Sequence, residues 1–246
     1  MTSFIIPAHN EELELAATLD AIHSAASHTG QPYEIIVVDD ASTDTTPEIA
    51  SRAGAKVIKI ERRQIAAARN AGGRAARGDH LFFVDADTRI NQIHVMQALA
   101  ALDAGYAGGS ARVVLDGIIP FWGRVLLHAF GVLYFGLNLG AGAFLFTTRG
   151  NFKAVGGFDE QYFAGEEVYF SLALRKLGRF KVLREPIVTS GRKLRMYPAK
   201  QFLQNFFGVI VGGPRAVRSR AKLRLWYDGK RESQLLPKGT NAVGPE

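Results

Sequence analysis

Two aspartates, Asp85 and Asp87, follow the apolar run 81–84 in the stretch LFFVDADT. The run predicts a buried strand, and side chains two residues apart on a strand point to the same side. Two carboxylates held this way repel each other unless a cation lies between them. Magnesium and manganese ions bind through one or two carboxylates plus substrate phosphates. The D-x-D pattern therefore predicts a divalent-ion site, although short acidic pairs also cap helices and turns.

A second acidic pair, Asp39 and Asp40, closes the apolar run of VVDDASTD, residues 37–44. The end of a central strand has no capping need for two acids, and a carboxylate there can accept hydrogen bonds from the imide N–H of a base or from a ribose hydroxyl. The following Ser42, Thr43 and Asp44 are typical of turns and helix caps.

A third pair, Glu166 and Glu167, lies in GGFDEQYFAGEEVYFSLALRKLG, residues 156–178. It is predicted to occupy the first turn of a helix that Gly178 ends. The helix dipole favours anions at this position, and this effect alone is a sufficient structural reason for two acids there. The other is chemical, because an accessible carboxylate there can act as a general base toward a sugar hydroxyl.

The elements that hold these acids alternate along the first part of the chain. Strands are predicted over residues 3–7, 34–40, 55–60 and 81–84, and helices over 12–27, 47–53, 65–78 and 91–103. Such alternation with short connections predicts a mostly parallel sheet, with ligands at the carboxyl ends of its strands. The loop after the first strand reads PAHNEE and lacks a glycine-rich phosphate cradle, which argues against a dinucleotide oxidoreductase.

The chain after residue 103 is less regular. Residues 125–146 carry no formal charge and are long enough to span a bilayer, but a crossing would separate Asp87 from the Glu166–Glu167 pair. We therefore expect a helix followed by a buried strand over residues 142–148, with a re-entrant or interfacial segment as the alternative. A pair of short strands is expected over residues 179–190, a helix over 197–211 and a loose polar tail from residue 228.

Composition limits the choice of environment and partner. The chain has no cysteine, which excludes disulfides and thiolate metal sites, and its start turns acidic too soon for a signal peptide. We therefore expect a cytoplasmic or cytoplasm-facing protein. Residues 175–231 carry a balance of +14, which leaves −7 for the rest of the chain. This basic segment could bind an anionic membrane surface or be a solvated face, and it lacks a nucleic-acid recognition motif.

Four segments, taken in their order along the chain, resemble family 2 glycosyltransferases, the inverting enzymes with a GT-A fold. They are FIIPAHNEE, EIIVVDDASTDTT, AAARNAGGRAARGDHLFFVDADT and the segment 142–178. The likeness covers roughly residues 3–195. It implies an α/β domain over 1–227, with a mostly parallel nucleotide-sugar-binding half (1–110) and a smaller mixed acceptor half (111–227), followed by a flexible tail (228–246). It also implies a nucleotide-sugar donor, UDP-linked by preference, a hydroxyl acceptor that could be lipid-linked, and Mn²⁺ or Mg²⁺.

Site residues follow from this resemblance by position. Pro7, Ala8 and Glu11 resemble the loop around the nucleoside, and Asp40, less surely Asp39, resembles the reader of the base. Arg69 resembles the basic residue that approaches the nucleotide. Asp87 resembles the metal ligand, with Asp85 on the ribose or on metal-bound water. Arg192, Lys193 and Arg195 correspond to a late basic loop that could close on the diphosphate.

The catalytic base implied by the resemblance is Glu167, with Glu166 in reserve. Relatives commonly carry Glu-Asp here, so Glu167 has one methylene more than usual, and a misplacement of about 1 Å can cost about a hundredfold in rate. The Q-x-x-R-W signature of processive synthases is absent, which predicts transfer of one sugar per encounter. Two alternatives stay open, a catalytically inactive nucleotide- or membrane-binding module and a sugar nucleotidyltransferase.

Overall fold

A single mixed sheet organises the part of the chain that the computed structural model describes, which comprises residues 1–117, 123–124, 131, 139–192, 213, 217–220 and 223. The strands are β1 (Thr2–Ala8), β2 (Tyr33–Asp40), β3 (Lys56–Ile60), β4 (His80–Val84), β5 (Thr88–Arg89), β6 (Gly108–Leu115), β7 (Phe144–Thr148) and β8 (Phe180–Thr189). Their order in the sheet is β3-β2-β1-β4-β7-β6-β8-β5. The first four are mutually parallel, whereas β7 runs antiparallel to both of its neighbours.

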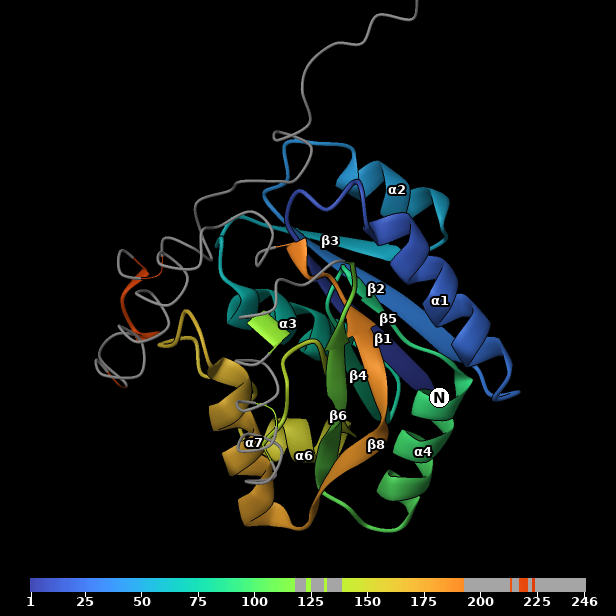
Figure 1. Ribbon diagram of the computed structural model, residues 1–246, viewed down its shortest axis with the longest axis vertical. Helices are drawn as coiled ribbons and strands as arrows, with labels where there is room; N and C mark the ends of the chain where they lie inside the picture. The colour runs from blue at the N-terminus through green and yellow to red at the C-terminus, as the bar shows by residue number, and fades with distance from the viewer. Residues whose placement is uncertain are drawn as a thin grey trace, which may run out of the picture.

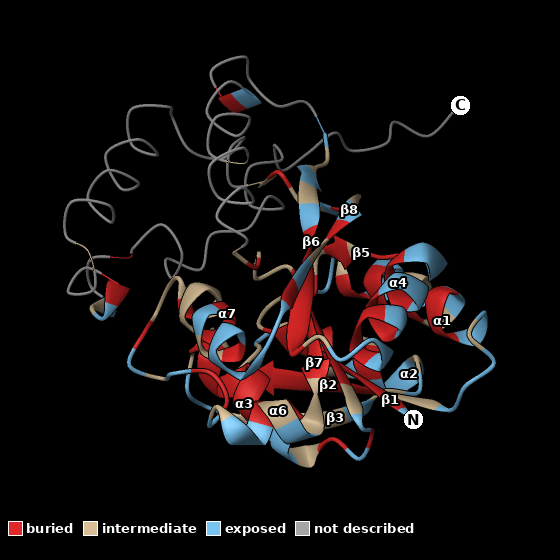
Figure 2. Ribbon diagram, turned by 90° about the horizontal axis from the view of Figure 1, so that it is seen from below, coloured by how far each residue is buried: buried red, intermediate tan, exposed pale blue. Residues whose placement is uncertain are grey.

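Helices cover both faces of this sheet (Figure 1). They are α1 (Leu15–Ser27), α2 (Thr46–Arg52), α3 (Ile65–Ala75), α4 (Gln92–Asp103), α6 (Arg149–Ala154) and α7 (Glu166–Leu177). Buried side chains of α1, α2 and α4 share one apolar cluster, and those of α3, α6 and α7 share another on the opposite face. Figure 2 shows the central strands β1, β4 and β7 buried between these two layers, whereas parts of β6 and β8 are exposed.

Alternation along each strand supplies both apolar clusters. Phe4 and Ile6 of β1 point into the layer of α1, and Ile5 points into the layer of α3. Helix α3 lies very close to the sheet, because a Cβ atom added at Gly72 would come within 2.3 Å of the Ile5 side chain. Gly72, the first of the two glycines in the AARNAGG motif, therefore allows α3 to pack this close to β1.

An aromatic cluster ties the later helices to β4. Phe83 of β4 meets Phe158 edge-on with ring centroids 5.0 Å apart, and Phe158 stacks on Phe170 of α7 at 4.0 Å. Burial of rings this large dominates local packing energy. The cluster thus fixes the N-terminal half of α7 relative to the end of β4.

The predicted strands and helices of the first 103 residues are confirmed, with one correction. Strand β4 ends at Val84, so Asp85 and Asp87 lie in the turn that leads into β5 and are not the continuation of a strand. The turn is closed by a hydrogen bond from the Thr88 N–H to the Asp85 carbonyl. The short strand β5 was not expected from the sequence.

The later elements agree less well with expectation. The buried strand predicted over 142–148 is present as β7. The pair of short strands expected over 179–190 is wrong, because β8 is one strand whose register against β6 shifts between Ala111 and Arg112. Strand β6 and helix α6 were not predicted at all.

Several predictions concern residues that the structure does not describe. The helix expected after residue 125 and the helix over 197–211 fall largely or wholly outside the described residues, as does the tail 228–246. The division into halves at residue 110 stays a prediction. Among the described residues, no helix combines the length and apolar character needed to cross a bilayer.

Candidate active site

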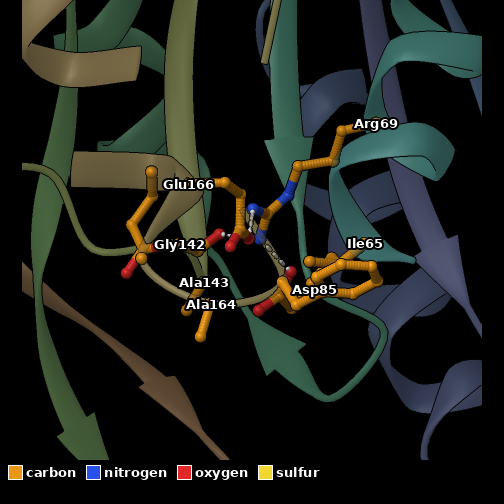
Figure 3. Close-up of a pocket in the computed structure, with 10 residues that line it drawn as sticks. Ile65, Arg69, Asp85, Gly142, Ala143, Ala164 and Glu166 are labelled. Atoms are coloured by element: carbon orange, nitrogen blue, oxygen red, sulfur yellow. Dashed lines mark hydrogen bonds and ion pairs between the residues drawn. The ribbon is translucent and has the colours of Figure 1, made fainter. Parts of the chain in front are cut away.

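A pocket of about 340 Å³ opens where β4 ends, beside the start of α7 (Figure 3). Helix α3 and the segment that enters β7 complete its wall. Its lining residues are Ile65, Arg69, Asp85, Gly142, Ala143, Phe163, Ala164, Gly165, Glu166 and Glu167. Because parallel strands bring their carboxyl ends to one edge, this is the edge where the sequence predicted a ligand.

The buried side chain of Arg69 is the centre of this pocket (Figure 3). Its Nη1 donates to Glu166 Oε1 at 2.7 Å, and its Nη2 donates to Asp85 Oδ1 and to the Gly142 carbonyl, both at 2.8 Å. One guanidinium thus joins α3, the end of β4, the entry to β7 and the start of α7. Charged hydrogen bonds of this kind are among the strongest in proteins.

The charges around Arg69 perturb one another. Burial alone would lower the pKa of Arg69, but the neighbouring carboxylates of Asp85, Glu166 and Glu167 raise it. Burial raises the pKa of Asp85 against the opposing effect of Arg69, and the nearby Asp87 raises it further. The guanidinium is therefore held in its charged form among acids that would repel one another without it.

Glu166 and Glu167 have different surroundings although they are adjacent in sequence. Glu166 is buried and paired with Arg69. Among the described residues, no side chain forms a hydrogen bond or ion pair with the Glu167 carboxyl group, and Arg69 acts on it only through its charge. Burial, and then the charge of Glu166, raise the pKa of Glu167 to about 8. A carboxyl group with a pKa near neutrality in a pocket is suited to take up and release a proton.

Helix α3 also anchors the loop that carries these two glutamates. The Asn70 side chain donates to the Phe158 carbonyl and accepts from the Phe158 N–H, both at 2.8 Å, and it donates to Glu160 at 2.9 Å. The Gln64 amide donates to the carbonyls of Glu160 and Tyr162. Because these partners lie just before Gly165, where α7 begins, α3 fixes the approach of both glutamates to the pocket.

The opposite wall, residues 140–143, is held by small polar side chains. The Ser171 hydroxyl of α7 accepts from the Gly140 N–H at 3.1 Å, and the Ser110 hydroxyl of β6 accepts from the Ala141 N–H at 2.9 Å. A Cβ added at Gly142 would lie 3.1 Å from Arg69 Nη2 and 3.6 Å from the Glu167 carboxyl carbon. Glycine at this position keeps the space between the two side chains open.

A second ionic cluster lies around Asp87, the other end of the D-x-D turn. Arg192, which follows β8, donates from both terminal nitrogens to the two Glu11 oxygens at 2.7 Å. Its Nη2 also lies 3.2 Å from Asp87 Oδ2, and the Thr189 hydroxyl donates to Asp87 Oδ1 at 3.1 Å. Each aspartate of the D-x-D thus pairs with an arginine, and the divalent ion expected at this turn stays a prediction.

The Asp39 and Asp40 side chains form hydrogen bonds to nearby backbone N–H groups. Asp40 Oδ1 accepts from the N–H groups of Arg62 and Arg63, and Oδ2 accepts from that of Gln64, all at 2.7 Å. This carboxylate fixes the turn that starts α3, and its role as reader of a base stays a prediction. Asp39 Oδ1 accepts from the Ser42 N–H at 3.2 Å, which makes a local turn.

The remaining predicted residues divide into those described and those not. Pro7 and Ala8 form the buried end of β1, with Ala8 beside Asp39 in register, and Glu11 belongs to the Arg192 cluster. Lys193 and Arg195 lie outside the described residues. Of the turn or cap roles expected in 42–44, a turn role is confirmed for Asp44, whose Oδ1 accepts from the Thr46 N–H and hydroxyl, whereas the N-cap of α2 is Thr45.

Several residues of the pocket were not identified from the sequence. Four of them bind backbone groups of segments remote in sequence with their side chains, namely Asn70, Gln64, Ser110 and Ser171. The fifth, Gly142, offers its own carbonyl to Arg69. For Asn70 a signal existed, because it directly follows Arg69 in the AARNAGG motif. A lone serine or glycine carries no such signal.

The fold is that of the GT-A glycosyltransferases, as comparison with solved structures shows. Glucosyl-3-phosphoglycerate synthase from Mycobacterium tuberculosis, solved with Mn²⁺, UDP and glucosyl-3-phosphoglycerate, has a TM-score of 0.61 at 18% identity. The match covers 94% of this chain and 81% of that structure. At this identity the likeness concerns the fold alone.

The family model described as "Glycosyl transferase family 2" matches residues 3–153, and the chain belongs to this family. A dolichyl-phosphate beta-glucosyltransferase from Drosophila melanogaster is 34% identical over 53% of this chain and 48% of its own length. A UDP-Glc:alpha-D-GlcNAc-diphosphoundecaprenol beta-1,3-glucosyltransferase from Escherichia coli is 36% identical over 39% of this chain and 41% of its own. The chain thus spans less than half the length of the curated relatives that it matches.

Proposed function

We propose that the protein is an inverting glycosyltransferase that moves one sugar from a nucleotide-sugar donor to a hydroxyl acceptor. The observation that carries this proposal is the position of Glu167, a pocket carboxyl group without a cationic partner of its own, beside the Asp85 end of the D-x-D turn. The pocket therefore combines a proton acceptor with acids suited to a donor complex. Membership of glycosyl transferase family 2 supports the same activity.

In the proposed reaction Glu167 takes the proton of the acceptor hydroxyl. The hydroxyl oxygen forms a bond to the anomeric carbon on the face opposite the nucleotide, and the bond from that carbon to the diphosphate oxygen breaks. The nucleoside diphosphate leaves with the bonding electrons, and the anomeric configuration inverts. Glu166 and Arg69 hold Glu167 and Asp85 in place, while Arg192, Lys193 and Arg195 are proposed to meet the diphosphate charge.

The acids of the D-x-D turn fit a divalent ion. Asp87 already has a cationic guanidinium at Oδ2, and Thr189 orients its other oxygen, so its environment accepts positive charge. Within the described residues no three acidic or histidine side chains form a metal cage. An ion held by one or two carboxylates plus donor phosphates needs no such cage. Bound Mn²⁺ or Mg²⁺ would neutralise the diphosphate, with Asp87 as ligand and Asp85 as its neighbour.

The donor is proposed to be a UDP-sugar and the acceptor a lipid-linked hydroxyl compound. Support comes from relatives whose names include UDP-Glc, a dolichyl phosphate and a diphosphoundecaprenol. Pro7, Ala8, Glu11, Asp39 and Asp40 are proposed to line the nucleoside end. We propose that the protein lies in the cytoplasm, peripheral to an anionic membrane surface. The basic segment 175–231 supports this attraction to an anionic surface.

A panel of nucleotide sugars tests this proposal. Each is incubated with the protein and Mn²⁺, and thermal stabilisation and release of the nucleoside diphosphate are measured. We expect one or a few UDP-sugars to raise the melting temperature and to be hydrolysed slowly. Stabilisation without hydrolysis or transfer to any hydroxyl compound would favour the inactive binding module, and no response to the whole panel would refute the donor assignment.

A further inference from the structure

Arg192 joins two acids that the proposed function assigns to different parts of the donor site. Its guanidinium makes a two-pronged pair with Glu11, at 2.7 Å for each bond, and reaches Asp87 at 3.2 Å. All three side chains are largely buried, with exposed fractions of 12% for Arg192, 11% for Glu11 and 17% for Asp87. An ion pair this well shielded is screened much less by water and salt than a surface pair.

The charge balance of this cluster explains why a cation is present. Glu11 and Asp87 are brought together by the ends of β1 and β4, and two buried carboxylates need a positive partner. A guanidinium is not deprotonated in proteins. Arg192 therefore stays charged and, at 3.2 Å, neutralises Asp87 in the free protein.

We propose that Arg192 occupies the place of the divalent ion at Asp87 until that ion binds with the donor. The inference rests on the proposed function, because it takes Asp87 as the ion ligand. A guanidinium 3.2 Å from Asp87 Oδ2 and a doubly charged ion on the same carboxylate repel each other. The ion and Arg192 therefore compete for Asp87, and Arg192 raises the ion concentration at which Asp87 is filled.

When the ion replaces Arg192 at Asp87, the Arg192 guanidinium becomes available to the donor. Once released from Asp87, its guanidinium keeps its bonds to Glu11 and lies beside the incoming ion and diphosphate. Arginine binds phosphate oxygens with the same fork geometry that it presents to a carboxylate. The same residue thus changes from a partner of the D-x-D to a partner of the donor.

The test measures Mn²⁺ binding to the free protein, without donor, by the electron paramagnetic resonance signal of unbound Mn²⁺. Four proteins are compared, namely wild type, Arg192→Gln, Arg89→Gln and Asp87→Asn. Arg89→Gln is the matched control, because Arg89 lies two residues from Asp87 and pairs with Glu14 at 2.6 Å. It removes the same charge from the same region while the Arg192 pair stays intact.

Removal of the competing cation should tighten Mn²⁺ binding. We expect the dissociation constant of Arg192→Gln to fall at least fivefold below wild type, the lower end of typical coupling between sites, and that of Arg89→Gln to change less than twofold. Arg192→Lys keeps the charge without the fork and should lie between wild type and Arg192→Gln. If Arg192→Gln fails to fold, as circular dichroism would show, Arg192→Lys is compared with wild type alone: tighter Mn²⁺ binding supports the place-holder role, and equal or weaker binding refutes it.

The Asp87→Asn variant distinguishes failure of the place-holder role of Arg192 from failure of the ion assignment at Asp87. If Asp87→Asn abolishes Mn²⁺ binding while Arg192→Gln binds like wild type or more weakly, the place-holder role is refuted and the ion assignment stands. If Asp87→Asn binds Mn²⁺ as tightly as wild type, the ion assignment of the proposed function fails, and the place-holder role fails with it.

Discussion

Glu166 and Glu167 are consecutive in α7, yet only Glu166 is paired with the Arg69 guanidinium, at 2.7 Å. Glu167 experiences the negative charge of its neighbour and burial without such a partner. Arg69 thus pairs directly with Glu166, whereas its charge only partly offsets the burial and the Glu166 charge that raise the pKa of Glu167. The pairing assigns Glu166 to the support of the pocket and leaves Glu167 as the group whose proton can move.

Replacing Glu167 by Gln should remove transfer while donor binding persists. Loss of a general base typically costs about 10²- to 10⁴-fold in turnover, and Gln keeps the size of the side chain. The measurement is kcat for transfer, together with the donor dissociation constant. Glu48→Gln on the exposed side of α2 is the control. Undiminished turnover in Glu167→Gln would move the base role to Glu166 or to another residue.

The raised pKa of Glu167 predicts a pH dependence of stability. Between its ordinary value near 4.5 and about 8, the folded protein keeps a proton that the unfolded chain has lost. The free energy of unfolding contributed by this group is therefore fully present at low pH and falls as pH rises through this window. Glu167→Gln should flatten that decline.

Urea unfolding at several pH values, with a chelator present, measures this effect. The difference in unfolding free energy between Glu167→Gln and wild type should increase with pH and level off above about pH 8. The rate of transfer by the wild type should rise through the same range as the base ionises. A pH-independent difference would mean that the pKa of Glu167 is the same in the folded and the unfolded protein.

Arg69→Met should destabilise the fold strongly. The substitution leaves Asp85 and the buried Glu166 without their cation, and breaking a buried ion pair on one side costs about 3–5 kcal/mol. The free energy of unfolding from urea titration measures the loss. Arg77→Met is the matched control, because the Arg77 side chain is 76% exposed beside Glu34, and it should cost less than about 1 kcal/mol.

Asp40→Asn separates a structural role from base recognition. Asn offers one acceptor oxygen where Asp40 offers two to three N–H groups, so at least one of the donors at residues 62–64 loses its partner. We expect the variant to lose about 1–3 kcal/mol of unfolding free energy. Unchanged stability combined with weaker UDP binding would instead support a direct contact with the base.

Local patterns were sufficient to predict where the acids lie along the chain. Apolar runs and helical spacing predict the first four strands and the helices between them, which hold Asp40 and Arg69, and Asp85 directly follows one of these strands. The resemblance also identified the acids around the pocket. Both methods depend on residues close together in sequence, where alternation and capping leave a clear signal.

The sequence could not predict which residues pair across the fold. Arg69 contacts Glu166, 97 positions later, and Arg192 contacts Glu11, 181 positions earlier. Strand β6 was missed because it begins with two glycines, which are rare in strands. Both are required by packing, since a Cβ at Gly109 would come within 2.2 Å of the Phe146 ring. Such requirements become visible only when the neighbouring strand is in place.

The loop before α7 is held by residues from much later in the chain. The Phe163 N–H donates to the Val217 carbonyl at 2.8 Å, and Arg218 donates to the Tyr162 hydroxyl at 2.9 Å. During synthesis the parallel strands leave the ribosome long before Val217 does. The wall of the pocket beside Glu167 is therefore completed only after Val217 and Arg218 have emerged, and a nascent chain that already has its sheet would still lack a finished site.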